Sequence, residues 1–194
     1  MRHLLTSPPA SEQIGDREAA LGRRPYVHMK RNDFSQGSNI VERTLILIKP
    51  DAMARGLAGT VLSRFEAKGL KIAGIKMIQL DEALLKAHYS HLADKPFFPT
   101  ICEFMSCTPV IALCLEGLEA VEVCRSLCGV TNSRKAAPGT IRGDLGMSMQ
   151  ANLVHASDSV ETAKAEVARF FKEDELFGYE QPVINFLYAS DERG

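Results

Sequence analysis

The sequence predicts an α+β fold of the ferredoxin-like kind, a doubled split β-α-β unit. Helices are expected to cover one face of a mainly antiparallel four-stranded sheet. Short apolar runs, which are typical of buried strands, alternate with amphipathic helical patterns between residues 41 and 188. Hydrophobic residues make up 45% of the 194 residues, which is enough for a full core. The element order (strand, helix, strand, helices, strand, helix, loop, strand, helix) then selects this fold.

The first half of the domain supplies two strands and their helices. Residues 44–48 form a continuous apolar run, as expected of a strand buried on both faces, and the run ends in Lys49-Pro50-Asp51. An amphipathic helix follows and should stop at Lys68-Gly69, because glycine is the usual helix terminator. Residues 71–80 have a strand-like pattern, and Asp81 or its neighbour should cap the next helix.

The second half contains a third strand, a helix and an unusual loop. Residues 110–115 are apolar and end in Glu116-Gly117, and a helix carrying Arg125 is predicted over residues 118–127. Residues 129–148 then form a long polar loop with four glycines. Loops of this length in compact domains are usually functional or disordered. Because the loop carries Thr131 and Arg142, we interpret it as a loop that grips phosphate.

Residues 152–159 hold the strongest functional signal. His155 is the only histidine in the second half of the chain, and two aliphatic residues that read as a strand end precede it. Asp158 and Glu161 stand at capping-box spacing, so a helix should begin near Ser159. The imidazole is therefore expected at a strand-to-helix junction, where unpaired N–H groups and the positive helix end attract phosphate.

A neutral imidazole is a competent nucleophile when a second group fixes its tautomer. Glu166 and Ser157 are the candidates for that orienting role. The alternative, on local sequence alone, is a histidine that only satisfies a hydrogen bond at a strand end. Lys49 is similarly either a solvated strand terminus or an ammonium group delivered into a cleft, where it meets ribose hydroxyls or phosphate.

Residues 95–99 form a proline-bounded turn with two adjacent aromatic residues, Phe97 and Phe98. One of them is expected to anchor the loop to the core, and the other is free to stack on a nucleotide base. The chain contains no G-x-x-x-x-G-K-[S/T] loop. A nucleotide enzyme with this sequence must therefore hold phosphates with side chains and a helix end.

The composition of the chain argues against several classes of function. The formal net charge of −1 argues against a general nucleic-acid or membrane surface, and no apolar run reaches membrane-spanning length. The five cysteines form no C-x-x-C pair and read as reduced thiols in a cytosol-like compartment. Cys124 and Cys128 offer a metal site as an alternative, but their spacing on an amphipathic helix favours packing.

Residues 1–40 differ from the domain over residues 41–194. They are rich in polar and breaker residues, so we expect a disordered N-terminal extension. Its mildly basic, hydroxylated start suggests organelle targeting, although Glu12 and Asp16 are out of keeping with an acid-poor transit peptide. A start at Met29 is the other alternative. Cytoplasmic localisation is the expectation for the domain itself.

Taken together, these motifs resemble the nucleoside diphosphate kinase family over residues 41–188. The order and spacing of the segments match, and the joint match is far more specific than any one motif. The segments are Ile48-Lys49-Pro50-Asp51, His88-Tyr89, Pro96-Phe97-Phe98, Pro138-Gly139-Thr140-Ile141-Arg142-Gly143-Asp144 and Asn152-x-x-His155-x-Ser157-Asp158.

The resemblance implies a kinase that transfers the γ-phosphate of a nucleoside triphosphate, mainly ATP, to nucleoside or deoxynucleoside diphosphates. The route is a ping-pong reaction through a phosphohistidine, which maintains the NTP and dNTP pools. Mg²⁺ would bridge phosphate oxygens without a dedicated protein cage, and a homo-oligomer, hexamer or tetramer, is expected. The implied roles are His155 as nucleophile, Glu166 and Ser157 as orienting groups, Lys49 and Asn152 on ribose, Phe97 on the base, and Arg125, Thr131, Arg142 and Tyr89 on phosphates.

Two departures from the family pattern stand near these residues. Ala156 replaces the usual glycine after the histidine and adds a methyl group beside the nucleophile, and Ser133 stands where proline often occurs. Two rival hypotheses remain. One is a nucleotide-binding scaffold or regulatory protein with weak or no turnover, and the other is a nucleic-acid binder that uses Phe97, Phe98 and the basic loop. The near-neutral charge makes the second rival secondary, and no specific nucleic-acid or membrane partner is expected.

Overall fold

The computed structural model describes residues 41–192, so the extension predicted over residues 1–40 lies outside the described residues. Four strands form one sheet in the order β2-β3-β1-β4, and every neighbouring pair is antiparallel. The strands are β1 (Val41–Ile48), β2 (Lys71–Ile78), β3 (Val110–Leu118) and β4 (Val154–Ala156). The predicted α+β architecture with a four-stranded antiparallel sheet is therefore confirmed.

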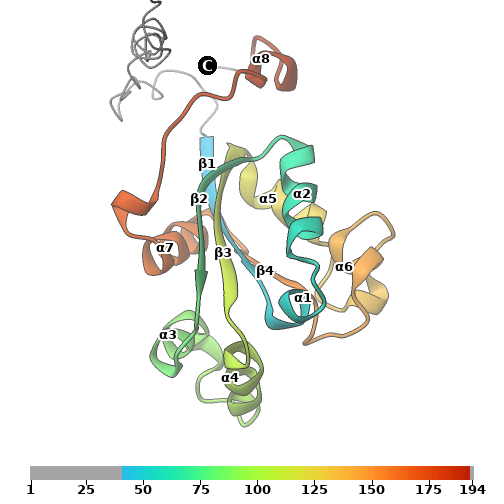
Figure 1. Ribbon diagram of the computed structural model, residues 1–194, viewed down its shortest axis with the longest axis vertical. Coiled ribbons are helices and arrows are strands. Elements are labelled where there is room, and N and C mark those ends of the chain that lie inside the picture. Colours follow the sequence, from blue (N-terminus) through green and yellow to red (C-terminus); the bar gives the residue numbers. More distant parts are fainter. Residues whose placement is uncertain (1–40, 193–194) are drawn as a thin grey trace, which may run out of the picture. The chain divides into compact units, whose positions relative to one another are not determined.

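Helices cover both faces of this sheet, so the expectation of one covered face is wrong. Figure 1 shows α2 (Ala58–Lys68) and α5 (Ala120–Cys128) on one side and α7 (Val160–Phe170) on the other. Ile46 and Ile48 pack toward the first pair, whereas Leu45 and Leu47 join a second core with α7. The reason lies in the continuous apolar run of β1, which buries side chains of both parities.

Local signals fixed several helix ends. Gly69 follows α2 with φ 99°, a conformation that suits glycine, and the Asp81 side chain accepts a hydrogen bond from Leu84 N (2.7 Å) at the start of α3 (Glu82–His88). The predicted capping box before α7 is one residue off. Ser159, not Asp158, is the N-cap, because its hydroxyl accepts from Thr162 N (3.1 Å).

The long loop at residues 129–148 is not continuous coil. It contains the short helices η2 (Ser133–Lys135) and α6 (Ile141–Leu145), and Thr140 caps α6 through Gly143 N (3.0 Å). Gly143 is tightly confined, since a Cβ there would collide with the Ala137 carbonyl. The predicted loop is thus a small folded unit.

Short elements and the C-terminal segment complete the chain. Tyr188 Oη accepts a hydrogen bond from Leu118 N (3.4 Å), so residues 182–188 run back over the domain as predicted. In the described part of the chain, no helix is long and apolar enough to cross a membrane. All five cysteines are free, and Cys124 and Cys128 are buried in a core, in keeping with the packing role. The remaining elements are α1 (Pro50–Ala54), η1 (Ser90–Leu92), α4 (Phe98–Ser106), η3 (Glu173–Glu175) and α8 (Ile184–Leu187).

Candidate active site

The edge strand β4 positions His155. The residue is the middle one of the strand and pairs with Leu47 of β1. The sequence had suggested a position just after the end of the strand, but the strand continues through the histidine. Its side chain is 20% exposed. The fully buried residues 45–48 of β1 therefore provide a rigid support for a histidine that solvent and ligands still reach.

A strained turn directly precedes this strand. Leu153 is fully buried with φ 73°, and Val154 N donates to Asn152 O (2.9 Å) across it, as in a γ-turn. A non-glycine residue in this region costs about 1–3 kcal/mol and needs support from its surroundings. Lys49 N donates to Leu153 O (2.9 Å) and Asp51 Oδ2 accepts from Leu153 N (2.9 Å). Asp51, which belongs to a motif of the sequence but was given no role there, therefore supports this turn.

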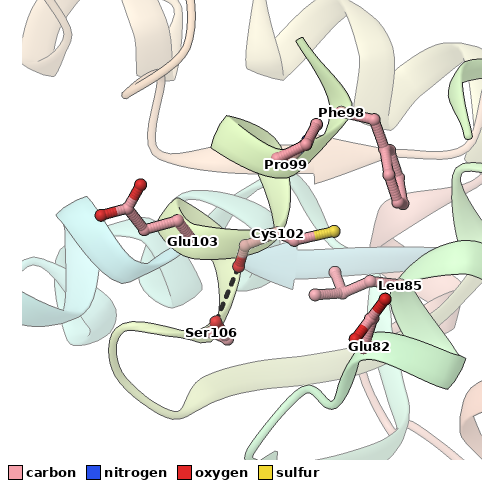
Figure 2. A pocket seen from close by; sticks show the side chains of 7 residues that line it. All are labelled: Glu82, Leu85, Phe98, Pro99, Cys102, Glu103 and Ser106. Carbon is pink, nitrogen blue, oxygen red and sulfur yellow. Dashed lines mark hydrogen bonds between the residues drawn. The ribbon is translucent and has the colours of Figure 1, made fainter. Parts of the chain in front are cut away.

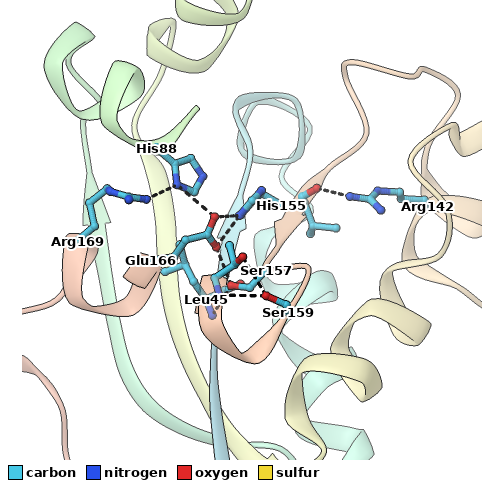
Figure 3. Close-up of polar contacts among 10 residues, drawn as sticks. Leu45, His88, Arg142, His155, Ser157, Ser159, Glu166 and Arg169 are labelled. Atoms are coloured by element: carbon cyan, nitrogen blue, oxygen red, sulfur yellow. Dashed lines mark hydrogen bonds and ion pairs between the residues drawn. The ribbon is translucent and has the colours of Figure 1, made fainter. Parts of the chain in front are cut away.

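Glu166 of α7 connects His155, the predicted nucleophile, with Ser157, the other predicted orienting residue. Its carboxylate oxygens lie 3.1 Å (Oε1) and 3.0 Å (Oε2) from Nε2 of His155, and Ser157 Oγ donates to Oε2 (2.6 Å), as Figure 3 shows. Burial by itself raises the pKa of Glu166, but the hydrogen bonds from His155 and Ser157 outweigh burial and hold this pKa below its usual value. The group is therefore an ionised carboxylate at neutral pH.

The position of Glu166 decides which ring nitrogen of His155 can act. A carboxylate only accepts hydrogen bonds, so the adjacent Nε2 carries the proton and Nδ1 keeps its lone pair. This assignment follows from the hydrogen-bond partners. The arrangement thus has the chemistry of a neutral nucleophile at Nδ1, with a negative charge placed to stabilise the imidazolium that forms after attack.

His88, at the end of α3, is a further member of the site. Its ring lies edge-on to His155 with centroids 4.5 Å apart, and Nδ1 lies 3.5 Å from Glu166 Oε1 and 3.5 Å from Arg169 Nη1. Burial, reinforced by the nearby His155, lowers the pKa of His88 to about 3, so the ring is neutral. Sequence reasoning missed this role, because nothing in the sequence pairs residue 88 with residue 166.

Lys49 and Asn152 meet in a buried corner beside the strained turn. Lys49 Nζ donates to Asn152 Oδ1 (2.8 Å) and to Gln150 O (2.9 Å). Burial lowers the pKa of Lys49 to about 8. The Asn152 amide donates in turn to Thr131 O (2.9 Å). The two predicted ribose contacts are therefore coupled to each other and to the loop that carries Thr131.

Arg142 holds the loop against the strand of His155. Its guanidinium donates to three carbonyls, those of Gly129 (2.6 Å), Asn152 (3.2 Å) and Val154 (2.7 Å). Burial lowers the pKa of Arg142, and the neighbouring positive charge of Arg125 adds to this effect. Arg125 and Thr131 are exposed. Lys49, Arg125 and Arg142 together make a cationic site that suits phosphate.

Three aromatic residues near the predicted site, Tyr89, Phe97 and Phe98, differ in burial. The Tyr89 ring centroid lies 6.2 Å from that of His155, and burial raises the pKa of its hydroxyl. Phe97 is 51% exposed at the start of α4, whereas Phe98 is 5% exposed. Within the described residues, no ring contact joins Phe97 to the other predicted site residues. One phenylalanine anchors the loop and the other stays open, as the turn at residues 95–99 indicated.

A separate cavity of about 350 Å³ lies between α3 and α4 (Figure 2). Leu85, Phe98 and Cys102 line it together with the carboxylates of Glu82 and Glu103. None of the residues predicted to bind nucleotide lines this cavity. Two carboxylates would repel phosphate, so this cavity does not suit the phosphates of a nucleotide.

Comparisons with known proteins show which family the chain resembles. The family model described as "Nucleoside diphosphate kinase" matches residues 42–176. A nucleoside diphosphate kinase from Parabacteroides distasonis is 55% identical over 152 residues, covering 78% of this chain and 99% of that protein. One from Pyrococcus horikoshii is 52% identical over 141 residues, covering 71% of this chain and 90% of that protein.

Solved structures show the same fold. A Halobacterium salinarum nucleoside diphosphate kinase in complex with CDP has a TM-score of 0.75 at 41% identity, covering 77% of this chain and 100% of that one. A Borrelia burgdorferi enzyme, a transition-state mimic with bound vanadate and ADP, has a TM-score of 0.70 at 37% identity, covering 74% and 94%. With the fold, the motif order and the matched residues in agreement, the chain belongs to the nucleoside diphosphate kinase family.

Proposed function

We propose that Nδ1 of His155 carries the γ-phosphate of a nucleoside triphosphate, mainly ATP, to nucleoside and deoxynucleoside diphosphates. As a member of its family the chain is a phosphotransferring enzyme, a nucleoside-diphosphate kinase. The observation that carries the proposal is the pair of contacts, 3.0 and 3.1 Å, between Glu166 and Nε2 of His155. They leave Nδ1 as the reacting nitrogen.

The reaction has two related halves. In the first, the Nδ1 lone pair forms a bond to the γ-phosphorus, and the bond to the β,γ-bridging oxygen breaks, so a nucleoside diphosphate leaves. Glu166 stabilises the positive charge on the imidazole, and Ser157 holds the carboxylate in place. In the second half, a terminal oxygen of another diphosphate attacks the phosphorus, and the lone pair returns to Nδ1.

The surrounding side chains are assigned to the nucleotide. Arg125, Arg142, Thr131 and Tyr89 would contact phosphates, and Lys49 and Asn152 would contact ribose. Stacking on the exposed Phe97 has no base-edge hydrogen bonds, so it should accept purines and pyrimidines. The relatives that bind CDP or ADP support nucleotides as the ligands. Since Arg142 already donates to three carbonyls, only its remaining donors could reach a phosphate.

A kinase of this family needs a divalent metal, and we propose Mg²⁺. The site fits an ion brought in by the nucleotide: Glu166 is engaged by His155 and Ser157, and the other nearby groups are mainly cationic. The phosphate oxygens would therefore hold most of the ion, with water completing its shell. When bound, Mg²⁺ neutralises charge on the phosphates. The protein side chains position the nucleotide and supply the nucleophile.

We also propose a homo-oligomer, a hexamer or tetramer, in the cytoplasm. Ile75 and Met77 of the outer strand β2 are 52% and 62% exposed, and Phe186 is 93% exposed. Exposed apolar side chains on a sheet edge favour contact with another chain. The five free cysteines fit a reducing compartment. Light scattering at several protein concentrations would measure the oligomer.

Mass spectrometry under non-acidic conditions tests the phosphohistidine directly. After mixing with Mg-ATP, the wild type should gain one phosphoryl group that is lost on addition of GDP, with GTP as the product. His155→Ala should gain none. A wild type that binds ATP without becoming labelled would contradict the kinase proposal and favour the nucleotide-binding scaffold.

A further inference from the structure

Three metal-ligating side chains converge at the catalytic histidine. One ligand atom from each of His88, His155 and Glu166 can be chosen so that all three lie within 4.8 Å of one another. His88 is buried, and its Nε2 has no hydrogen-bond partner among the described residues. Two imidazoles and one carboxylate are the ligand set of many transition-metal sites. The mechanism proposed above uses only two of these three groups.

The distances are close to those a metal would impose. Zinc binds histidine nitrogen and carboxylate oxygen at about 2.0–2.2 Å, so ligand atoms in a tetrahedron are about 3.3 Å apart. Glu166 Oε1 lies 3.1 Å from Nε2 of His155 and 3.5 Å from Nδ1 of His88. The third separation, between the two histidine nitrogens, is at most 4.8 Å and has to become about 3.3 Å when an ion binds. His155 is partly exposed, which leaves room for its ring to turn and for water to take a fourth position.

We propose that His88, His155 and Glu166 form an inhibitory site for a borderline divalent transition-metal ion of the Zn²⁺ class. An ion bound at Nε2 of His155 occupies the lone pair of that nitrogen, so the single proton of the neutral ring, which Nε2 carries in the metal-free site, moves to Nδ1. Nδ1 then has no lone pair for the γ-phosphorus. Mg²⁺ does not compete for the site, because it prefers oxygen ligands in octahedral geometry.

One neighbouring charge opposes the metal. Arg169 Nη1 lies 3.5 Å from Nδ1 of His88, and Arg169 is otherwise on the exposed face of α7. A guanidinium this close repels a divalent cation. Replacement by neutral glutamine, Arg169→Gln, is therefore expected to tighten metal binding. Arg169 has no assigned contact with nucleotide, so this variant should keep its kinase activity.

Metal binding is measured first without nucleotide, in protein whose accessible thiols have been replaced. Cys102 is partly exposed and Cys107 is exposed, and both could bind zinc, so Cys102→Ser and Cys107→Ser form the background. Zn²⁺ titration calorimetry should give one ion per chain, and Co²⁺ should give the visible absorption of a four-coordinate site. His88→Phe should weaken binding by at least about tenfold, and Arg169→Gln should strengthen it.

Unchanged Zn²⁺ affinity in both His88→Phe and Arg169→Gln would overturn the site. Circular dichroism checks that the buried His88→Phe substitution leaves the protein folded. If His88→Phe does not fold, the Zn²⁺ affinity of the surface variant Arg169→Gln tests the site alone. Inhibition of phosphohistidine formation by Zn²⁺, relieved in His88→Phe, tests the consequence and rests on the proposed function. A wild type that binds zinc but never becomes phosphorylated would refute that function and leave the site standing. Phosphohistidine formation that is insensitive to saturating Zn²⁺ would refute the inhibition.

Discussion

Both carboxylate oxygens of Glu166 face a single nitrogen of His155, with Nε2 at 3.0 and 3.1 Å. The same carboxylate also receives the Ser157 hydroxyl at 2.6 Å and lies 3.5 Å from His88. Glu166 is only 4% exposed, so these protein groups take the place of water around its charge. The orientation of the nucleophile therefore depends on one buried negative charge, and this dependence can be measured.

Replacement of Glu166 by glutamine removes this charge and keeps the shape. We expect phosphohistidine formation to slow by about 10²-fold, since a preorganised charge at a reacting centre contributes on that scale. Quenched-flow measurement with Mg-ATP gives the rate. Ser157→Ala, which keeps the charge, should have a smaller effect. A Glu166→Gln rate within twofold of the wild type would show that the carboxylate does not stabilise the imidazolium.

Acid should destabilise the protein through His88. Burial lowers the folded-state pKa of His88 from 6.5 to about 3, so between these values the unfolded chain binds a proton that the folded chain does not. The contribution of His88 to the free energy of unfolding is therefore complete above pH 6.5 and is lost as the pH falls toward 3. The slope approaches about 1.4 kcal/mol per pH unit for one proton. Glu166, whose pKa is also lowered, adds to the loss below about pH 4.5.

Urea unfolding at pH 7.5, 6.0 and 5.0 measures this slope. His88→Phe removes the titrating group, so its stability should depend less on pH over that interval, whatever its absolute value. Replacement of the exposed His91 in the same way is the matched control: His91 is the smallest of the causes that lower the pKa of His88, so the slope should change much less than in His88→Phe. Equal slopes in wild type and His88→Phe would mean that another group causes the acid sensitivity.

The sequence predicted the elements that depend on local pattern. The apolar run of β1, the glycine after α2 and the Asp81 cap each act through near neighbours, and each was found as predicted. The contact between His88 and Glu166 joins two helices whose separation along the chain carries no pattern. The positive φ of Leu153 also has no local signal, because leucine rarely adopts it. Tertiary contacts impose both features.

The strain at Leu153 predicts an unusual order of substitutions. Leu153→Ala loses buried methyl groups and should destabilise the protein by about 2–5 kcal/mol. Leu153→Gly loses slightly more volume, but glycine adopts φ 73° freely, whereas alanine does not. We therefore expect glycine to be no more destabilising than alanine. Urea unfolding compares the two, and Leu45, fully buried in a regular strand, is the control at which glycine should be clearly worse.

Phe97 and Phe98 offer a matched pair for testing base recognition. Phe97 is 51% exposed and Phe98 only 5%, although they are adjacent. If the exposed ring stacks on the base, Phe97→Leu should weaken the binding of ADP, GDP, CDP and UDP alike, by up to the 1–3 kcal/mol that stacking provides. Transfer from the phosphorylated enzyme at varied diphosphate concentration measures the four affinities.

Phe98→Leu should instead lower the free energy of unfolding and leave those affinities nearly unchanged. A Phe97→Leu effect on one base alone would point to specific base contacts, and equal affinities in wild type and Phe97→Leu would remove Phe97 from the site.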